Sequence, residues 1–276
     1  MREGRAASGR ASLEVTLDYF EQLEALAAQL GGYFYPWRSA LGAGNGEDAY
    51  TQLVEAHLSA GKVVLDAGCG HGTDMLAFAP KAGRFIGYDA VESFIAIARR
   101  RAADAGLANV ELVLCNSSAR FNGGAARIPV ADHALDLIIS RRGPTNWVAD
   151  ARRACRPGAR LIQLNPLPGP AIPWNGDLPE TLRMAENPAN PDHPELVREI
   201  EAALAAAGLR LDEGRIFDAP EVFSEPQELY RALTFMRFEP ETPSWDAARP
   251  HLDRLFARRG PIELRQRRYL WTAVVD

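Results

Sequence analysis

The stretch K-V-V-L-D-A-G-C-G-H-G, from Lys62 to Gly72, decides the fold of this chain. An apolar run ends in Asp66 and is followed at once by glycines at alternate positions. Glycine adopts positive φ without steric cost and lacks the Cβ atom that would collide with a ligand, so bare backbone can approach it. The N–H groups that open the next helix have no partner within the helix and suit polar or anionic groups. The stretch therefore predicts a strand-to-helix turn that binds a nucleotide or a nucleoside.

The spacing of the glycines argues against a dinucleotide. The fingerprint G-x-G-x-x-G would need a glycine at position 73, where this chain has Thr73. The carboxylate of Asp66 at the strand end would also repel a pyrophosphate, whereas it attracts an ammonium or sulfonium group in a partly dry site. We therefore expect a nucleoside that carries a cationic arm.

Five ordered motifs resemble those of the class I S-adenosylmethionine-dependent methyltransferases, whose first motif is an apolar strand followed by D/E-x-G-x-G. After this motif come R-F-I-G-Y-D (84–89), V-E-L-V-L-C-N-S (110–117), I-P-V-A-D-H-A-L-D-L-I-I-S (128–140) and R-P-G-A-R-L-I-Q-L-N (156–165). The likeness covers about residues 50–220. It implies S-adenosylmethionine as the cofactor.

The resemblance also implies which residues contact the cofactor. Asp89 lies 19 residues after Gly70, close to the spacing of a βαβ unit, and matches the acid that takes the ribose hydroxyls. Asn116 stands where the family most often has aspartate, and its amide both accepts and donates hydrogen bonds at an adenine edge. The predicted cofactor residues are Asp66, Ala67, Gly68, Gly70, Gly72, Asp89, Ala90, Asn116, Ser117 and Arg141.

Two segments outside these motifs are expected to cover the substrate. The stretch 31–46 sets aromatic side chains between glycines just before the cofactor loop, which predicts a lid. The proline-rich stretch 165–180 leaves the carboxyl end of the fifth strand, the edge at which α/β sheets bind ligands. The predicted substrate-binding residues are Tyr35, Trp37, Arg142, Asn146, Asn165 and Trp174.

Simpler structural roles stay open for several of these residues. Asp66 and Asp89 are also suited to cap the turn and the helix that follow them. Arg141 and Arg142 are suited to hold the cofactor, to bind an acidic substrate, or merely to pair with nearby acids. The aromatic residues also suit plain packing. The sequence indicates no catalytic base, because no histidine is tied to a carboxylate by a recognisable motif.

The alternation of apolar runs and helical periodicity predicts a Rossmann-like, doubly wound α/β fold with a mostly parallel, seven-stranded sheet. Strands are expected near 62–67, 84–88, 110–115, 134–140, 160–165, 210–217 and 265–275, and the resemblance implies that the last two form an antiparallel hairpin at the sheet edge. Helices are expected near 12–30, 50–60, 73–80, 91–105, 147–155 and 194–207.

The same patterns divide the chain into two parts. Residues 1–60 are expected to form an N-terminal helical and lid segment, and residues 61–276 a methyltransferase domain. Insertions are expected at about 165–192 and at 224–260, the second as two helices separated by E-P-E-T-P-S. Both insertions are expected to roof the substrate site.

Composition and charge are those of an ordinary globular protein. Of 276 residues, 47% are hydrophobic and 24% are charged, and no membrane span is visible. The first residues lack the apolar core of a signal peptide, which predicts a cytoplasmic location. Three cysteines on separate elements argue against a disulfide framework and against a clustered metal site.

The function predicted first is methyl transfer to a small-molecule acceptor. The net charge of −5 gives no overall footprint for nucleic acid, although residues 249–268 hold seven arginines against Asp253 and Glu263. The middle of the chain is also similar to ribosomal RNA guanine methyltransferases, but no cysteine precedes Cys69 to form their N-terminal zinc module. A methyltransferase of rRNA or tRNA bases and a non-catalytic binding protein are the alternatives. The sequence indicates neither the acceptor nor the oligomeric state.

Overall fold

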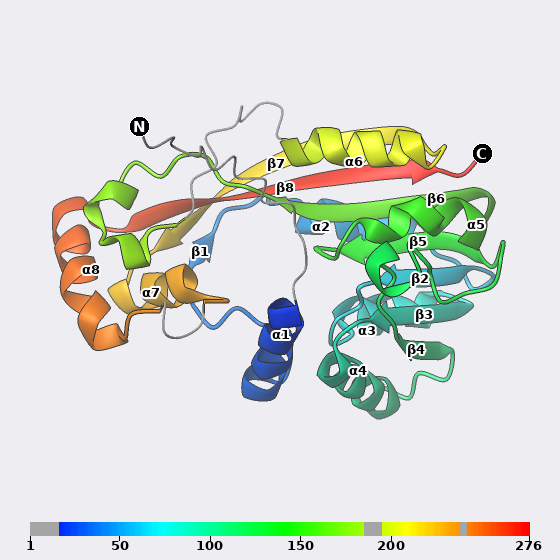
Figure 1. Cartoon of the computed structure of the whole chain (residues 1–276), viewed down its shortest axis with the longest axis horizontal. Helices are drawn as coiled ribbons and strands as arrows, with labels where there is room; N and C mark the ends of the chain where they lie inside the picture. Colours follow the sequence, from blue (N-terminus) through cyan, green and yellow to red (C-terminus); the bar gives the residue numbers. More distant parts are fainter. Residues whose placement is uncertain (1–16, 185–194, 238–241) are drawn as a thin grey trace, which may run out of the picture.

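The computed structural model describes residues 17–184, 195–237 and 242–276 (Figure 1). Within those ranges, eight strands form one sheet in the order β1-β7-β8-β6-β5-β2-β3-β4. The strands are β1 (Ala40–Leu41), β2 (Val63–Ala67), β3 (Arg84–Asp89), β4 (Val110–Leu114), β5 (Leu135–Arg141), β6 (Cys155–Leu167), β7 (Arg210–Phe223) and β8 (Ile262–Val274). The helices are α1 (Leu17–Leu30), α2 (Glu47–His57), α3 (Thr73–Phe78), α4 (Glu92–Asp104), α5 (Ala151–Ala154), α6 (Glu195–Ala206), α7 (Pro226–Thr234) and α8 (Trp245–Arg259). None of these helices has the length and the apolar character needed to cross a lipid bilayer.

The sheet confirms the predicted fold class. Strands β2 to β6 are parallel to one another, whereas β8 runs antiparallel to β6 and β7 antiparallel to β8. The eighth strand, β1, was not predicted. It has only two residues, which pair with Glu221 and Val222 of β7, and two residues are too few to carry an alternating pattern.

Helices bury both faces of the parallel strands. In β2, Val64 packs in a cluster with Tyr50 of α2 and Phe78 of α3, whereas Leu65 packs on the other face in a cluster with Trp147. All five side chains are fully buried. A strand that is covered on both faces needs apolar residues at successive positions, which is why these strands are visible in the sequence as continuous apolar runs.

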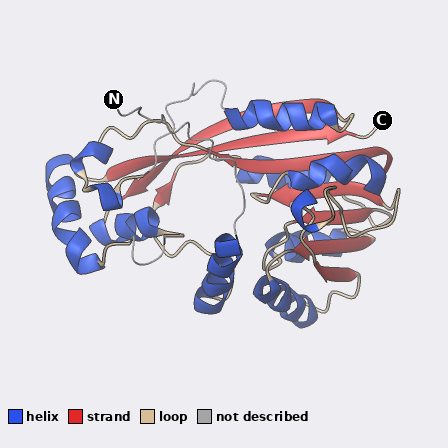
Figure 2. Ribbon diagram, viewed as in Figure 1, coloured by secondary structure: helices blue, strands red, loops and turns tan. Residues whose placement is uncertain are grey.

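The hairpin of β7 and β8 extends far beyond the parallel strands. The strand expected to end at Phe217 continues to Phe223, although it contains Pro220. Proline donates no ladder hydrogen bond, but it is tolerated near a sheet edge. On the side away from β8, β7 pairs only with the short β1 among the described strands. Helices α7 and α8, the two predicted for the second insertion, pack at the far end of this hairpin with Phe223 (Figure 2).

The N-terminal helix packs on the methyltransferase-like core through α4. It was predicted for residues 12–30, of which 12–16 lie outside the described ranges. Leu23 packs in a cluster with Val91 and Phe94. The carboxylate of Glu24 accepts a hydrogen bond of 2.7 Å from the amide of Glu92, so α1 caps the first turn of α4.

The proline-rich insertion is described as far as residue 184. After β6 it contains two short 3₁₀ turns, Asn175–Asp177 and Glu180–Leu182, and otherwise irregular backbone. This agrees with the expectation that its prolines exclude longer regular elements. Residues 185–192 of the predicted insertion lie outside the described ranges.

Candidate active site

The glycine loop, residues 68–72, joins β2 to α3 at the carboxyl edge of the parallel strands. Gly68 and Gly70 have φ of 75° and 53°, in the left-handed region that favours glycine. A Cβ on Gly68 would lie 3.0 Å from Cδ of Pro144, whereas one on Gly70 would meet no heavy atom of the described residues within 4 Å. The amides of Gly68 and Cys69 donate to the carbonyl of Tyr88 at 3.0 and 2.9 Å. The loop is thus fixed against β3 while Gly70 presents bare backbone to open space.

The carboxylate of Asp89 holds this loop from the end of β3. Its Oδ2 accepts a hydrogen bond from the amide of Gly70, and its Oδ1 accepts one from the amide of Val91, both at 2.9 Å. Burial raises the pKa of Asp89, against the hydrogen bonds from Val91 and Gly70, which lower it. Asp89 therefore connects the glycine loop to Val91, the residue just before α4. An ionised carboxylate has about four lone-pair sites, so this one can still accept a hydroxyl.

Asp66 lies in β2 beside the loop and is only 2% exposed. Burial raises its pKa well above the usual range, the nearby charge of Asp74 adds to this, and Arg141 opposes it. Within the described part of the chain, no donor forms a hydrogen bond with its carboxylate. A buried carboxylate without a donor is unfavourable, and a cation placed beside it would relieve this cost. The position fits a ligand with an ammonium or sulfonium group.

The residues after β4 form a polar edge on the other side of Asp89. Oδ1 of Asn116 accepts a hydrogen bond of 3.0 Å from the amide of Ser118. The hydroxyl of Tyr88 donates to Oγ of Ser117 at 3.0 Å, and Oγ of Ser117 donates to Oδ1 of Asn146 at 3.2 Å. The structure thus places Asn146, which was predicted to bind the substrate, beside the residues that were predicted to contact adenine.

Three further small residues were predicted for the cofactor site, and they lie next to the ends of β2, α3 and β3. Ala67 is the last residue of β2, and its carbonyl accepts a hydrogen bond of 2.7 Å from the Ser140 hydroxyl. Gly72 precedes α3 with φ of 84°. Ala90 connects β3 to the residue that caps α4. All three contribute backbone rather than functional side-chain groups.

Arg141 takes part in an ion-pair network between α2 and α3. Its Nη2 lies 2.8 Å from Oδ1 of Asp74, and its Nη1 lies 3.1 Å from Oε2 of Glu47. Its guanidinium also lies 4.8 Å from the ring centre of Tyr50, whose hydroxyl donates to Asp74 at 2.9 Å. Arg141 was predicted to contact the cofactor, but its donors are used here to hold α2 against the helix that follows the glycine loop.

The aromatic segment, residues 33–37, brings three of the predicted substrate residues together. The rings of Tyr35 and Trp37 stack with their centres 4.6 Å apart, and both meet Phe235 edge-on at 5.5 and 5.3 Å. Nη1 of Arg142 donates to the hydroxyl of Tyr35 at 3.2 Å. These contacts join the segment to the residue after β5 and to the end of α7, so it connects two parts of the molecule.

His71 fastens the aromatic segment to the glycine loop. Its Nδ1 accepts a hydrogen bond of 3.1 Å from the amide of Tyr33, and its ring lies 4.5 Å from that of Phe34. Burial lowers the pKa of His71 to about 4, and the charges of Arg101 and Arg142 add to this effect. The sequence places His71 in the cofactor loop but gives it no role. The local signal is a histidine among the glycines, because its partner in the aromatic segment, the Tyr33 amide, lies 38 residues away.

The last two predicted substrate residues lie in hydrophobic core. Trp174 is 5% exposed in a cluster with Leu178 and Phe223, and its Nε1 donates to the carbonyl of Glu263 at 3.3 Å. Asn165 is 4% exposed, and its Oδ1 accepts a hydrogen bond of 2.8 Å from Nε1 of Trp271. Both side chains are nearly fully buried and hydrogen-bonded within the protein, and their assignment as substrate contacts stays a prediction.

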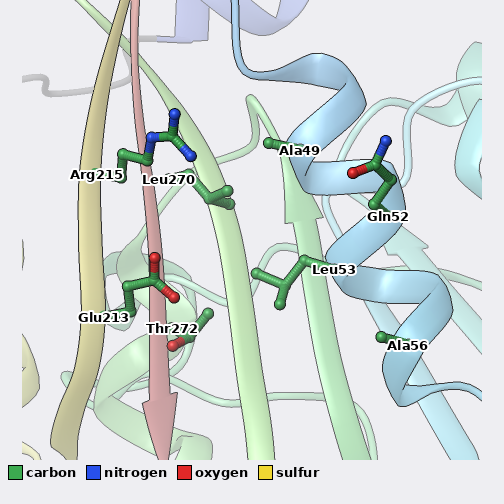
Figure 3. A pocket seen from close by; sticks show the side chains of 8 residues that line it. All are labelled: Ala49, Gln52, Leu53, Ala56, Glu213, Arg215, Leu270 and Thr272. Carbon is green, nitrogen blue, oxygen red and sulfur yellow. The ribbon is translucent and has the colours of Figure 1, made fainter.

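A shallow hollow of about 310 Å³ lies elsewhere, between α2 and the hairpin of β7 and β8 (Figure 3). It is lined by Ala49, Gln52, Leu53 and Ala56 of α2, Glu213 and Arg215 of β7, and Leu270 and Thr272 of β8. None of the predicted site residues lines it. The chemistry of the glycine loop and its acids is therefore not connected with this hollow.

The central strands and their loops match a known family. Residues 64–163 match the family model of a methyltransferase domain. This match, together with the curated relatives below, supports the class I S-adenosylmethionine-dependent methyltransferase family that the sequence motifs predicted. The matched range runs from β2 into β6, so it contains the glycine loop and the acids at the ends of β2 and β3.

Two curated relatives are similar over part of their length. The uncharacterised methyltransferase YcgJ of Bacillus subtilis (strain 168) is 33% identical over 119 residues, which are 43% of this chain and 43% of YcgJ. An uncharacterised 37.1 kDa protein in transposon TN4556 of Streptomyces fradiae is 33% identical over 115 residues, 38% of this chain and 30% of that protein. The match thus spans less than half the length of either relative.

A solved structure extends the likeness in fold. The crystal structure of a functionally unknown protein from Deinococcus radiodurans R1 covers 93% of this chain and 100% of its own, with a TM-score of 0.64 and 23% identity. At that identity the likeness concerns the fold alone. Its coverage shows that the likeness in fold reaches well beyond residues 64–163.

Proposed function

We propose that this protein binds S-adenosylmethionine and transfers its methyl group to a small-molecule acceptor. One observation carries the proposal: within a methyltransferase domain, the bare backbone of Gly70 and the buried carboxylate of Asp66 lie together at the carboxyl edge of the sheet. This edge is where α/β sheets bind their ligands. Both features suit a nucleoside with a cationic arm.

The residues of the site fit the parts of this cofactor. Asp66 supplies the negative charge that attracts the sulfonium and ammonium groups. Asp89 keeps lone pairs for the ribose hydroxyls, and Asn116 keeps its side-chain NH₂ for the adenine edge, since that group donates to no described residue. When it is bound, the cofactor supplies a methyl group that is already activated by the positive charge on sulfur.

The chain itself then has to orient the acceptor and exclude water. The aromatic segment and Phe235 form an apolar cover that is fastened to the glycine loop by His71. Such alignment contributes up to about 7–11 kcal/mol in favourable systems. His71 is not placed to act as a base, because Nδ1 accepts from the Tyr33 amide and Nε2 contacts the Thr73 hydroxyl at 3.1 Å. Its role in the proposal is to position the cover.

The distribution of the arginines in residues 249–268 favours a small molecule over RNA. Arg258 and Arg259 pair with Asp177 in the proline-rich insertion. Arg265 pairs with Asp218 and Glu263. Arg267 and Arg268 are buried in the sheet. Binding to the phosphates of RNA needs an exposed basic face, and these side chains do not form one.

The proposal is tested by transfer of labelled methyl from S-adenosylmethionine to a panel of metabolites and structured RNA. We expect label in a small molecule. Label confined to RNA, with affinity that falls steeply with salt, would favour the RNA alternative. Cofactor binding without transfer to any acceptor would favour the non-catalytic alternative.

The cofactor contact is tested separately by Asp89→Ala. We expect this variant to lose the thermal stabilisation that S-adenosylmethionine gives the wild type, because both the ribose acceptor and the hydrogen bond to Gly70 are removed. Asp136→Ala is the matched control, since Asp136 also accepts a backbone hydrogen bond, 2.8 Å from the Val63 amide, at the opposite end of β2. Equal loss of stabilisation in both variants would contradict the assignment.

A further inference from the structure

Three arginines surround a single carboxylate beside the aromatic segment. Oε2 of Glu47 lies 3.1 Å from Nη1 of Arg141, whereas Oε1 of Glu47 lies 3.9 Å from Nε of Arg142 and 3.8 Å from Nε of Arg268. Only the first of these distances allows a hydrogen bond. Glu47 therefore neutralises mainly Arg141. The guanidinium groups of Arg142 and Arg268 are too far from the Glu47 carboxylate to form a hydrogen bond with it.

Arg268 is the buried member of this arginine cluster. It lies on β8, is 7% exposed, and donates from Nη2 to Oε1 of Gln266 at 3.1 Å and from Nη1 to the carbonyl of Arg267 at 3.3 Å. Its Nε is buried and has no hydrogen-bond partner among the described residues. Buried charged donors are almost always paired, so this nitrogen points to an acceptor that a ligand supplies.

Arg142 is the accessible member of the cluster. Its side chain is 30% exposed, and the hydrogen bond from Nη1 to the Tyr35 hydroxyl leaves Nε and Nη2 for another acceptor. Its φ is 62°, a left-handed conformation that is unfavourable for a residue with a Cβ. Backbone strain of this kind is concentrated at functional sites.

The acids of this region are concentrated on Arg141. It pairs with Glu47 and Asp74 at 3.1 and 2.8 Å, and the charge of Asp66 also acts on it, whereas Arg142 and Arg268 lie 3.9 and 3.8 Å from Glu47. A guanidinium group offers parallel N–H donors that match the oxygens of a carboxylate or a phosphate. The arginine cluster therefore has both the charge and the donors for such a group.

The position of Arg268 separates this anion from the cofactor. In the sheet, β8 lies three strands from β2, about 14 Å at the usual strand spacing. Arg268 is also connected to the aromatic segment, because Gln266 donates to Oε2 of Glu221 at 2.8 Å and Nε1 of Trp37 donates to Oε1 of Glu221 at 2.9 Å. The cluster thus extends from the glycine loop toward the side that the cover encloses.

We propose that Arg142 and Arg268 bind an anionic group, a carboxylate or a phosphate, of the methyl acceptor. The assignment to the acceptor rests on the proposed function, whereas the anion site itself rests on the contacts of the cluster. The carboxylate of the cofactor is the other source of the same chemistry. The distance of Arg268 from β2 favours the acceptor.

The test uses inorganic sulfate as the probe. Sodium sulfate is titrated into the full-length protein, with and without S-adenosylhomocysteine, at an ionic strength held constant with sodium chloride, and binding is followed by calorimetry and thermal shift. We expect saturable binding in both cases and a loss of affinity of about tenfold in Arg268→Gln and in Arg142→Gln. Arg265→Gln, on the same strand but paired with Asp218 and Glu263, should bind sulfate as the wild type does.

A gain in affinity distinguishes this site from general damage to the fold. Glu47→Gln removes the carboxylate that competes for Arg142 and Arg268, so it should bind sulfate several-fold more tightly than the wild type. If Arg268→Gln does not fold, Arg142→Gln and Glu47→Gln decide the result. Unchanged sulfate affinity in these variants would overturn the proposal.

The same samples separate this inference from the proposed function. Competition between S-adenosylhomocysteine and sulfate would assign the anion site to the carboxylate of the cofactor and overturn the assignment to the acceptor. Cofactor binding without a sulfate site would overturn only this inference. A sulfate site in a protein that binds no cofactor would instead overturn the proposed function.

Discussion

The two halves of the candidate site are assembled over very different distances along the chain. In the cofactor half, the hydrogen bond between the Gly70 amide and Asp89 joins residues 19 positions apart. In the acceptor half, the hydrogen bond between Arg142 and Tyr35 joins residues 107 positions apart, and the one between Trp37 and Glu221 joins residues 184 positions apart. The first half is one local unit of the sheet, whereas the second exists only once the whole chain has folded.

This difference leads us to expect that the two halves respond separately to mutation. The cofactor half lies on parallel strands that are buried on both faces. The acceptor half lies between those strands and the far end of the β7 and β8 hairpin, which has its own apolar cluster with α7 and α8. Variants that affect one half and spare the other test the comparison.

The largest effect is expected in the apolar cluster of α7 and α8, which contains Trp174. Trp174→Ala removes a buried indole from the apolar cluster of α7 and α8, so the free energy of unfolding should fall by about 3–5 kcal/mol, while the affinity for S-adenosylmethionine stays as in the wild type. Chemical denaturation and calorimetry measure the two quantities. Trp174→Phe is the milder control. A variant of normal stability with a raised KM for the acceptor would show instead that Trp174 is the pocket wall expected from the sequence.

A loss of about two orders of magnitude in cofactor affinity is expected for Gly70→Val, because a branched side chain would occupy the space in front of the bare backbone. Gly106→Val is a matched control. Gly106 also has positive φ, at 65°, and a Cβ there would also meet no described atom within 4 Å, but it lies at the end of α4. Both variants should lose similar stability, and only Gly70→Val should lose the cofactor. Equal cofactor binding by the two variants would contradict the role of Gly70 in the cofactor half.

A smaller effect, about tenfold in affinity, is expected for Asp66→Asn, and it should concern the cationic cofactor far more than neutral S-adenosylhomocysteine. Burial raises the pKa of Asp66, so protons compete with the cation at this carboxylate. The affinity for S-adenosylmethionine should therefore rise with pH through this raised pKa and level off above it, while that for S-adenosylhomocysteine changes less. Calorimetric titrations at several pH values measure both. A wild type with the same pH profile for the two ligands would contradict the charge argument.

The smallest effect is expected where the two halves meet. His71→Ala removes the acceptor of the Tyr33 amide, so stability should fall by about 1 kcal/mol and amide exchange in residues 32–38 should become faster. In the wild type the pKa of His71 is lowered to about 4 from 6.5, so the unfolded chain takes up the proton first. The folding stability that results from this lowered pKa is present above pH 6.5 and is lost as the pH falls toward 4. His251→Ala, on α8, is the control, and equal effects of the two substitutions would contradict the role of His71.

The sequence predicted the local half of the site and most of the sheet for a physical reason. The apolar runs of β2 and β3 and the glycines at positive φ are properties of neighbouring residues, so they are visible without tertiary structure. The match to the family model of a methyltransferase domain spans these local motifs. The roles of the individual residues in the cofactor site stay predictions until a ligand is bound.

The rest depended on contacts that no local pattern records. Trp174 was expected to line the pocket because it follows β6, but it packs against the β7 and β8 hairpin. Arg267 and Arg268 are adjacent in the sequence and point to opposite faces of β8, and only the partner strands determine which of them faces Glu47. The continuation of β7 through Pro220 likewise depends on its place near the sheet edge.

Calorimetric titration of the wild-type protein with S-adenosylmethionine is the most direct test of the central claim, that the glycine loop and its two acids hold a cationic nucleoside. The account predicts one binding site per chain that saturates below about 1 mM, with a matching rise in thermal stability. An absence of both heat and stabilisation at that concentration would contradict the account, as would a phosphate-bearing dinucleotide that binds at the glycine loop in its place.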